Sequence, residues 1–311
     1  MQTFEGGGVA PATVQRIHVD TPAGRLHALT WGPSDAPIAL CLHGFPDSAH
    51  GWRKVAPILA DAGWRVVAPF MRGYAPSSVP SDSSYHIGAL MDDALRVLAA
   101  VGPTGRDVLV GHDWGAMTGA GLAALPDSPF SSAVLMSVPP SRACWPRRGT
   151  GLRRSLPVLL PPQLLRFWYL VFFQLPWLPE RFVPRLIPLL WRRWSPGYDA
   201  HTDLPDVLRA IGAPDNIRAA VSAYRHLVRQ RGLPGRYAPL HPYFTGALRV
   251  PTLYLHGSDD GCMSVDFAYR VPPVLPPGGD LAIVARAGHF LQLEQPEVVA
   301  RRILDFVGPA R

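Results

Sequence analysis

Asp113 is the first candidate for chemistry, because of the residues on either side of it. Gly111 and Gly115 stand two positions before and after it in the segment Gly-His-Asp-Trp-Gly. Glycine at both positions is typical of a tight turn that holds its central residue in a strained conformation, where larger neighbours would collide. An aspartate isolated on such a turn can act as a nucleophile. The alternative is an ordinary helix N-cap, since aspartate is a favoured capping residue.

Two further titratable segments follow Asp113 in an order that suits a catalytic triad. Residues 256–261 read His-Gly-Ser-Asp-Asp-Gly, and His289 stands in Ala-Gly-His-Phe near the end of the chain. A carboxylate can orient a histidine, which then acts as a general base. Asp259 and Asp260 are both candidates for that acid. The order of nucleophile, acid and histidine predicts hydrolytic chemistry.

Each of these residues is expected at the end of a strand, because strand and helix patterns alternate along the chain. Strand patterns occur at 14–19, 26–31, 37–42, 65–69, 108–110, 133–138, 250–255 and 281–285, and helical patterns at 52–62, 85–101, 116–124 and 297–307. The first two strands flank a turn signal and predict an antiparallel hairpin. The later strands, joined by helices through short links, predict a mostly parallel central sheet with helices on both faces.

Residues 140–248 interrupt this alternation. The stretch is dense in proline, arginine and large aromatic residues and is too long for a loop in a compact domain, so we expect an inserted helical cap. The chain then divides into a first part of the core at 1–139, the cap at 140–248, and a second part of the core at 249–311. Arg166 and repeated prolines interrupt every apolar window of the ~20 residues that a membrane-spanning helix needs.

On these motifs the chain resembles the soluble epoxide hydrolases of the α/β-hydrolase superfamily, from about residue 14 to residue 307. The matching segments are His-Gly-Phe-Pro-Asp at 43–47, Arg-Gly-Tyr at 72–74, Gly-His-Asp-Trp-Gly at 111–115 and Gly-His-Phe at 288–290. The resemblance implies an α/β-hydrolase fold in which the common spacing Gly-x-x-Asp favours Asp260 over Asp259 as the acid. The backbone N–H groups of Phe45 and Trp114 would form the oxyanion hole.

The resemblance also assigns two tyrosines in the cap. Members of the family use such a pair to bind the epoxide oxygen, and Tyr169 in Tyr-Leu-Val-Phe-Phe-Gln-Leu-Pro and Tyr224 in Ala-Tyr-Arg-His match their contexts. The alternative is that both are core residues whose hydroxyls have other partners. The implied reaction converts an apolar epoxide, aryl or long-chain, to a vicinal diol. Asp113 forms a covalent alkyl ester, and water activated by His289 and Asp260 hydrolyses it. No metal or organic cofactor is expected.

Two other functions remain open. Haloalkane and haloacid dehalogenases use the same Asp-His-Asp triad, although many haloalkane enzymes carry Asn in place of Phe45 and fluoroacetate-type enzymes carry Arg in place of Trp114. A non-catalytic, ligand-binding member of the superfamily is the third possibility. Intact Asp113, Asp260 and His289 argue against it, because a binding protein has no need of all three.

Composition narrows the partners and the compartment. With 48% hydrophobic and 17% charged residues the chain can build a large core. Residues 1–12 are Gly-rich and polar and predict a flexible tail rather than a signal peptide. Cys41, Cys144 and Cys262 are far apart and not in metal-ligand spacing, which favours free thiols in the cytoplasm.

The net charge of +7 is almost entirely arginine, since Lys54 is the one lysine. No nucleic-acid-binding motif accompanies it, so nucleic acid is not an expected partner. The arginines and aromatic residues of 152–194 leave two possibilities open. The outer face of the cap is either simply solvated, or it binds weakly to an anionic membrane surface. A homodimer also remains open.

Overall fold

The computed structural model describes residues 14–144, 156–230 and 232–310. The predicted tail at 1–12, and Arg153 and Arg154 of the predicted cap, lie outside the described residues. The strands are β1 Gln15–Thr21, β2 Gly24–Trp31, β3 Ile38–Leu42, β4 Arg65–Pro69, β5 Val108–His112, β6 Ser132–Met136, β7 Thr252–Gly257 and β8 Asp280–Val284.

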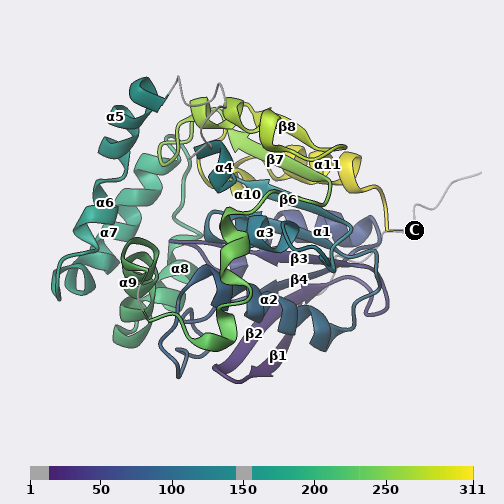
Figure 1. Ribbon diagram of the computed structural model, residues 1–311, viewed down its shortest axis with the longest axis horizontal. Helices are drawn as coiled ribbons and strands as arrows, with labels where there is room; N and C mark the ends of the chain where they lie inside the picture. The colour runs from purple at the N-terminus through teal and green to yellow at the C-terminus, as the bar shows by residue number, and fades with distance from the viewer. Residues whose placement is uncertain (1–13, 145–155, 231, 311) are drawn as a thin grey trace, which may run out of the picture.

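These strands form one sheet in the order β1-β2-β4-β3-β5-β6-β7-β8 (Figure 1). β2 is antiparallel to both of its neighbours, and every pair from β4 to β8 is parallel. β3 and β5 are buried along their whole length, as expected for apolar strands covered on both faces. The predicted mostly parallel sheet, begun by an antiparallel hairpin, is confirmed.

The helices that flank the sheet are η1 Ala49–Trp52, α1 Val55–Asp61, α2 Ile87–Val101, α3 Trp114–Ala123, η5 Val265–Arg270, η6 Pro272–Val274, α10 Leu291–Glu294 and α11 Pro296–Val307. α1 packs against α11, and α2 packs against α3. The predicted helix at 52–62 is wrong at its start. The Ser48 side chain accepts a hydrogen bond from the His50 N–H and caps a separate 3-10 turn that ends at Trp52, so the α-helix begins only at Val55.

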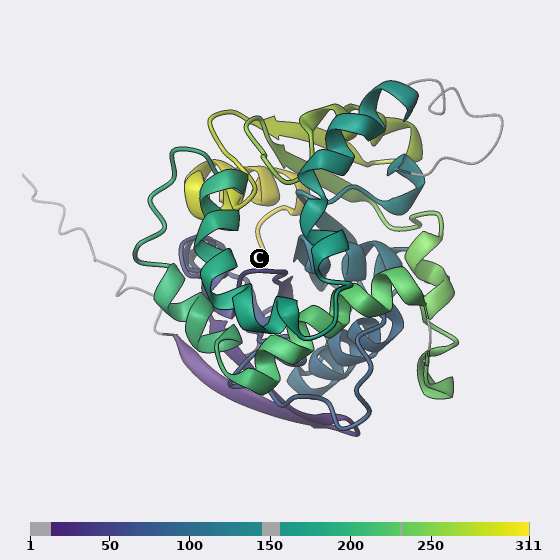
Figure 2. The same ribbon diagram turned by 90° about the vertical axis from the view of Figure 1, so that its left-hand side faces the viewer.

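A group of helices lies between β6 and β7. They are α4 Ser141–Cys144, α5 Leu156–Arg166, α6 Trp168–Phe172, α7 Leu178–Trp194, α8 Leu204–Ile211, α9 Pro214–Arg229, η3 Gly235–Tyr237 and η4 His241–Thr245. Helices α5 to α9 gather beyond one end of the strands, at the left of Figure 1 and toward the viewer in Figure 2. Among the described residues, no helix combines the length and the apolar character needed to cross a bilayer.

Helix α7 forms despite three prolines. Pro179 lies in its first turn, where a missing N–H breaks no helical hydrogen bond, and Pro184 and Pro188 lie inside it. Its buried residues recur every three or four positions, which is the period of an amphipathic helix. They are Pro179, Val183, Leu186, Ile187, Leu190, Trp191 and Trp194. Packing of this apolar side therefore outweighs the low helix propensity of proline.

Candidate active site

Asp113 lies at the turn between β5 and α3 with a left-handed backbone, φ 54°. The glycines on either side are required by space. A Cβ on Gly111 would come within 2.3 Å of the Gly115 carbonyl oxygen, and a Cβ on Gly115 within 2.0 Å of the Leu42 carbonyl oxygen. The strained turn expected from the spacing of the glycines is therefore present. It presents a carboxylate that is 6% exposed.

A backbone N–H group from another loop binds this carboxylate. The N–H of Phe45, in the loop after β3, donates a hydrogen bond to Asp113 Oδ1 at 2.8 Å. Gly44 makes this approach possible, because a Cβ there would stand 2.1 Å from Asp113 Oδ1 and 2.6 Å from the backbone nitrogen of Trp114. The two residues predicted to form an oxyanion hole thus flank Asp113.

His289 links Asp113 to Asp260. Its Nδ1 lies 2.9 Å from Asp260 Oδ2, and its Nε2 lies 3.6 Å from Asp113 Oδ2. All three residues are buried, whereas Asp259 is exposed. The structure brings Asp260 to the histidine and leaves Asp259 at the surface, with its backbone N–H bonded to the carbonyl of Ala287.

The loop around Asp260 keeps this acid ionised. The N–H groups of Cys262 and Met263 donate to Asp260 Oδ1 at 2.7 and 3.0 Å. Burial alone would raise the pKa of Asp260, but His289, together with these hydrogen bonds, holds the pKa below its usual value. A charged carboxylate at this position is suited to orient and stabilise an imidazolium.

His289 carries a raised pKa. Burial alone would lower the pKa, but the charges of Asp260 and Asp113 outweigh burial and raise it to about 10. The imidazolium therefore stabilises the folded chain fully below about pH 6.5, and that contribution is lost as pH rises toward about 10.

This arrangement predicts a shift that NMR can measure. Replacing Asp113 with asparagine removes one of the two negative charges, so we expect His289 to titrate at a lower pH than in the wild type. Proton–nitrogen correlation spectra of the imidazole, recorded over the pH range of both titrations, would measure the two midpoints. An unchanged His289 titration in the variant would mean that the charge of Asp113 does not raise the pKa of His289.

The backbone of the histidine loop is held from several sides. The side chains of Ser137 and His112 approach the His289 carbonyl oxygen at 2.7 and 2.8 Å. The Glu294 carboxylate accepts hydrogen bonds from the N–H groups of Gly288 and Phe290, and from the Ser195 hydroxyl. Sequence reasoning missed Glu294. A carboxylate five residues after His289 on a short helix was the available signal, and it is a weak one.

Helix α7 ends against both loops that carry the His–Asp pair. The carbonyl oxygen of Trp194 accepts hydrogen bonds from the N–H groups of Gly261 and His289, at 3.0 and 2.9 Å. Gly261 is required here, because a Cβ would lie 1.9 Å from the Arg193 carbonyl oxygen. The Trp194 indole also contacts the His289 ring, with centroids 5.0 Å apart. The end of α7 thus helps to position the His–Asp pair.

Helix α5 contacts the acid loop as well. The Gln163 amide donates to the Cys262 carbonyl at 2.7 Å and accepts from the Ser264 N–H at 3.0 Å. Arg166 donates to the Asp260 carbonyl at 2.7 Å. These contacts were not expected from the sequence, because the stretch carries no motif that points to them.

Tyr169 of α6 and Tyr224 of α9 lie together over the carboxylate side of this site. Their ring centroids are 5.7 Å apart, and Tyr224 packs edge-on against Phe45 and Trp114 at 5.3 and 5.1 Å. Burial raises the pKa of both phenols well above the usual value, and the negative charge of Asp113 raises each further. The two hydroxyls therefore stay protonated and lie within electrostatic reach of Asp113.

The second reading of these tyrosines, as core residues, also finds some support. The Tyr169 hydroxyl lies 3.6 Å from the Cys262 sulfur, a weak partner for a phenol. Burial and ring packing would serve a core role equally well. Only a change in rate on removal of the hydroxyls separates the two readings.

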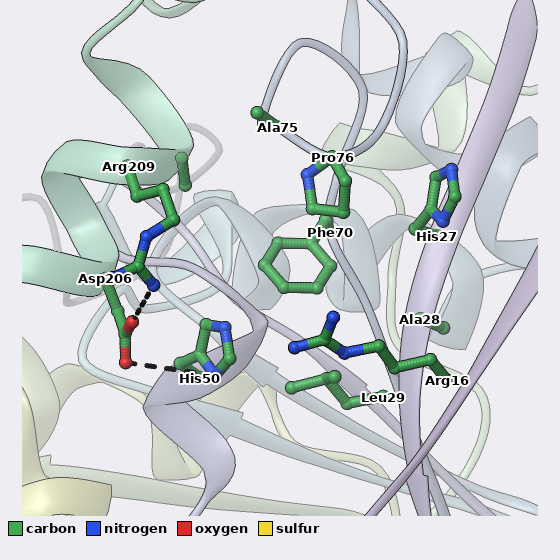
Figure 3. A pocket seen from close by; sticks show the side chains of 11 residues that line it. Arg16, His27, Ala28, Leu29, His50, Phe70, Ala75, Pro76, Asp206 and Arg209 are labelled. Atoms are coloured by element: carbon green, nitrogen blue, oxygen red, sulfur yellow. Dashed lines mark hydrogen bonds and ion pairs between the residues drawn. The ribbon is translucent and has the colours of Figure 1, made fainter.

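A separate cleft of about 220 Å³ opens between β2 and α8 (Figure 3). Its lining includes Arg16, His50, Phe70, Asp206 and Arg209, and none of the residues assigned above. Arg209 is already paired with Asp206 there, and the Asp206 carboxylate also faces His50. Among the described residues, no cluster of three or more His, Cys, Asp or Glu side chains is arranged to hold a metal ion.

Comparison with known proteins places the chain in a family. Residues 37–296 match the family model described as the alpha/beta hydrolase fold. The chain is 30% identical to epoxide hydrolase A of Mycobacterium tuberculosis, over 95% of this chain and 98% of the relative. It is 26% identical to epoxide hydrolase 4 of Homo sapiens, over 91% of this chain and 75% of the relative. A solved epoxide hydrolase from an endophytic Streptomyces matches with a TM-score of 0.72 and 25% identity, covering 94% of this chain and 95% of that one.

The chain therefore belongs to the α/β-hydrolase fold family, as the match over residues 37–296 shows. Within it, the chain groups with the relatives that are named epoxide hydrolases. The resemblance inferred from the motifs, first to the α/β-hydrolases and then to the epoxide hydrolases among them, is confirmed.

Proposed function

We propose that this protein is an epoxide hydrolase that converts an apolar epoxide to a vicinal diol through a covalent ester on Asp113. One observation carries the proposal. Asp113, buried on a strained turn, has its Oδ2 3.6 Å from His289 Nε2, and Tyr224, which contacts the Tyr169 ring, packs against the neighbouring Phe45 and Trp114. A carboxylate suits displacement at a saturated carbon, and phenols suit protonation of the departing oxygen. The names of the relatives support the same activity.

In the first step, Asp113 Oδ attacks an epoxide carbon and the carbon–oxygen bond of the ring breaks. Tyr169 and Tyr224 hydrogen-bond the departing oxygen, and one of them transfers its proton to it. Without this proton the leaving group would be an alkoxide, which departs poorly. The product of the step is a hydroxyalkyl ester of Asp113.

In the second step, the charge change at Asp113 prepares His289 to act as a base. Ester formation removes the negative charge of Asp113, which is one cause of the raised pKa of His289. The pKa falls, the imidazolium returns a proton to the tyrosinate left by the first step, and the neutral ring then takes a proton from water. The water oxygen bonds to the carboxyl carbon of Asp113, and the N–H groups of Phe45 and Trp114 stabilise the oxyanion. The ester bond then breaks and the departing oxygen takes the proton of the newly formed carboxyl group. This step releases the diol and restores the Asp113 carboxylate, which now contains the water oxygen.

The remaining proposals concern organisation and setting. We infer that the helices of 140–248 form a cap on a core made of 1–139 and 249–311, since α5, α6 and α7 supply contacts to the site while the sheet supplies Asp113. Cys41, Cys144 and Cys262 are free thiols, which suits the cytoplasm. Neither inference affects the chemistry.

Product analysis tests the reaction directly. Purified protein is incubated in parallel with styrene oxide and 1-bromobutane, and diol and bromide are quantified. We expect diol from the first substrate and no bromide above background from the second, because phenols assist an oxygen leaving group whereas a halide needs no proton. Bromide release without diol would establish a dehalogenase. Absence of both products across a panel of aryl and long-chain epoxides would favour a ligand-binding protein.

A further inference from the structure

Large apolar side chains are exposed on the side of the cap that faces away from the sheet. Leu165, Val171 and Trp177 are 79%, 72% and 71% exposed. Six of the eleven large hydrophobic side chains that are exposed in the described residues fall between positions 164 and 182. We call these six the outer cap surface: Leu164, Leu165, Val171, Leu175, Trp177 and Phe182. Four of them lie on α5, α6 and α7, and Leu175 and Trp177 lie in the link between α6 and α7. In Figure 2 these helices face the viewer.

An apolar groove adjoins this surface. It measures about 320 Å³, lies between α6 and α7, and is lined by Trp168, Phe172, Phe182, Arg185, Leu186 and Leu189. Tyr169 of α6 and Phe173, just after it, are buried, whereas the neighbouring Trp168 and Phe172 line the groove. The same short helix therefore contributes to both the apolar groove and the tyrosine pair.

The same side of the cap is strongly basic. Arg181, Arg185 and Arg192 share the exposed side of α7 with Phe182 and Leu189, by the helical period. Within the described residues, none of the three arginines has a hydrogen-bond or ion-pair partner, and the same is true of the exposed Arg193. Between positions 141 and 198 the sequence has a single acidic residue, Glu180, and its carboxylate forms an ion pair with Arg225.

Exposed apolar side chains beside unpaired arginines favour one kind of partner. A second copy of the chain, docked face to face, would bring these arginines against their own counterparts, because a two-fold interface repeats the same patch on both sides. A nucleic acid would use the arginines but not the aliphatic side chains of α5 and α6. An anionic lipid bilayer offers both negative headgroups and an apolar layer beneath them.

We propose that the outer cap surface docks on anionic lipid membranes, with the apolar side chains entering the headgroup region and the arginines of α7 binding lipid phosphates. Tryptophan at position 177 suits the interface, where aromatic rings are enriched. If the proposed function holds, docking places the apolar groove where lipophilic epoxides accumulate. The docking itself does not depend on catalysis and is measured without a substrate.

Vesicle co-sedimentation of the full chain tests the proposal. Vesicles of phosphatidylcholine alone are compared with vesicles holding equal parts of phosphatidylcholine and phosphatidylglycerol. We expect binding to the anionic vesicles only, and loss of binding as sodium chloride rises through the range where screening acts. Each basic residue near such a surface strengthens binding about fivefold, so Arg181→Gln with Arg185→Gln should weaken it about 25-fold. Trp177→Ser with Leu165→Ser should weaken binding to a similar degree.

Matched variants on the other side of the molecule serve as controls. Arg301→Gln with Arg302→Gln, and Val298→Ser, remove exposed residues of the same types from α11 and should leave vesicle binding unchanged. Unfolding temperatures verify that each variant is folded. Three outcomes would overturn the proposal. The first is no binding to anionic vesicles, and the second is an equal loss of vesicle binding in the α11 variants. The third is a dimer, detected by light scattering, that the Trp177 and Leu165 substitutions convert to monomer. Tighter binding to duplex DNA than to vesicles, lost with the α7 arginines, would assign the surface to nucleic acid instead.

Discussion

Asp113→Ala should abolish turnover of an apolar epoxide, and the loss should be the largest of any single substitution in this protein. In the proposed mechanism the reaction begins at this carboxylate, and no other carboxylate lies next to both His289 and the Phe45 N–H in the described part of the chain. Steady-state diol formation measures the effect. Asp259→Ala is the matched control, because Asp259 is exposed and away from the histidine, and it should retain activity near that of the wild type.

His289→Gln separates the two halves of the same reaction. Without the base, the ester should form and persist, so mass spectrometry of the intact variant should show the mass of protein plus epoxide. In the wild type, a single turnover in heavy-oxygen water should place the label in Asp113, since water attacks the carboxyl carbon. Label found only in the diol after that first turnover would mean that water attacks the epoxide directly, and the proposed ester would be wrong.

Removing the two cap hydroxyls should have the second largest effect. Tyr169→Phe and Tyr224→Phe should each lower the rate of ring opening by about 10²–10³, the usual loss for one donor in a water-poor site. The double variant should be nearly inactive and still folded, since both rings and their packing with Phe45 and Trp114 remain. Pre-steady-state ester formation is the measurement, because it isolates ring opening from ester hydrolysis.

Tyr243→Phe provides the comparison for that pair. Tyr243 lies on η4, only partly buried, and no described side chain bonds its hydroxyl. Its loss should leave ring opening unchanged. Turnover near the wild-type rate in the Tyr169 and Tyr224 double variant would return both residues to a packing role and favour dehalogenase chemistry.

The central sheet was predictable because its signals are local. Apolar runs such as 37–42 become strands that are buried on both faces. The glycines at 111 and 115 indicate a tight turn, because a larger residue at either position would clash with the backbone. The order of nucleophile, acid and histidine along the chain could likewise be predicted from the sequence. The choice of Asp260 over Asp259 rested on spacing alone. The structure shows a physical difference between the two, because only Asp260 turns inward to receive the Cys262 and Met263 N–H groups.

The helices over the site could not be delimited in the same way. Prolines at 184 and 188 read as helix breakers, yet α7 runs through both because its apolar side is buried against the rest of the molecule. Glu294 escaped notice for a different reason. Its partners are backbone N–H groups of the histidine loop, and backbone groups carry no sequence signal. Tertiary contacts of this kind become visible only once the chain is folded.

One oxygen atom limits how this enzyme could be re-engineered. The Trp194 carbonyl oxygen binds one N–H of the acid loop and one of the histidine loop, so the last turn of α7 supports His289, the proposed base. Grafting a foreign cap with junctions at the outer ends of the insertion would exchange that turn and loosen the His–Asp pair. A chimera that retains residues 193–195, together with Gln163 and Arg166 of α5, would keep the contacts that hold the acid loop and the histidine loop.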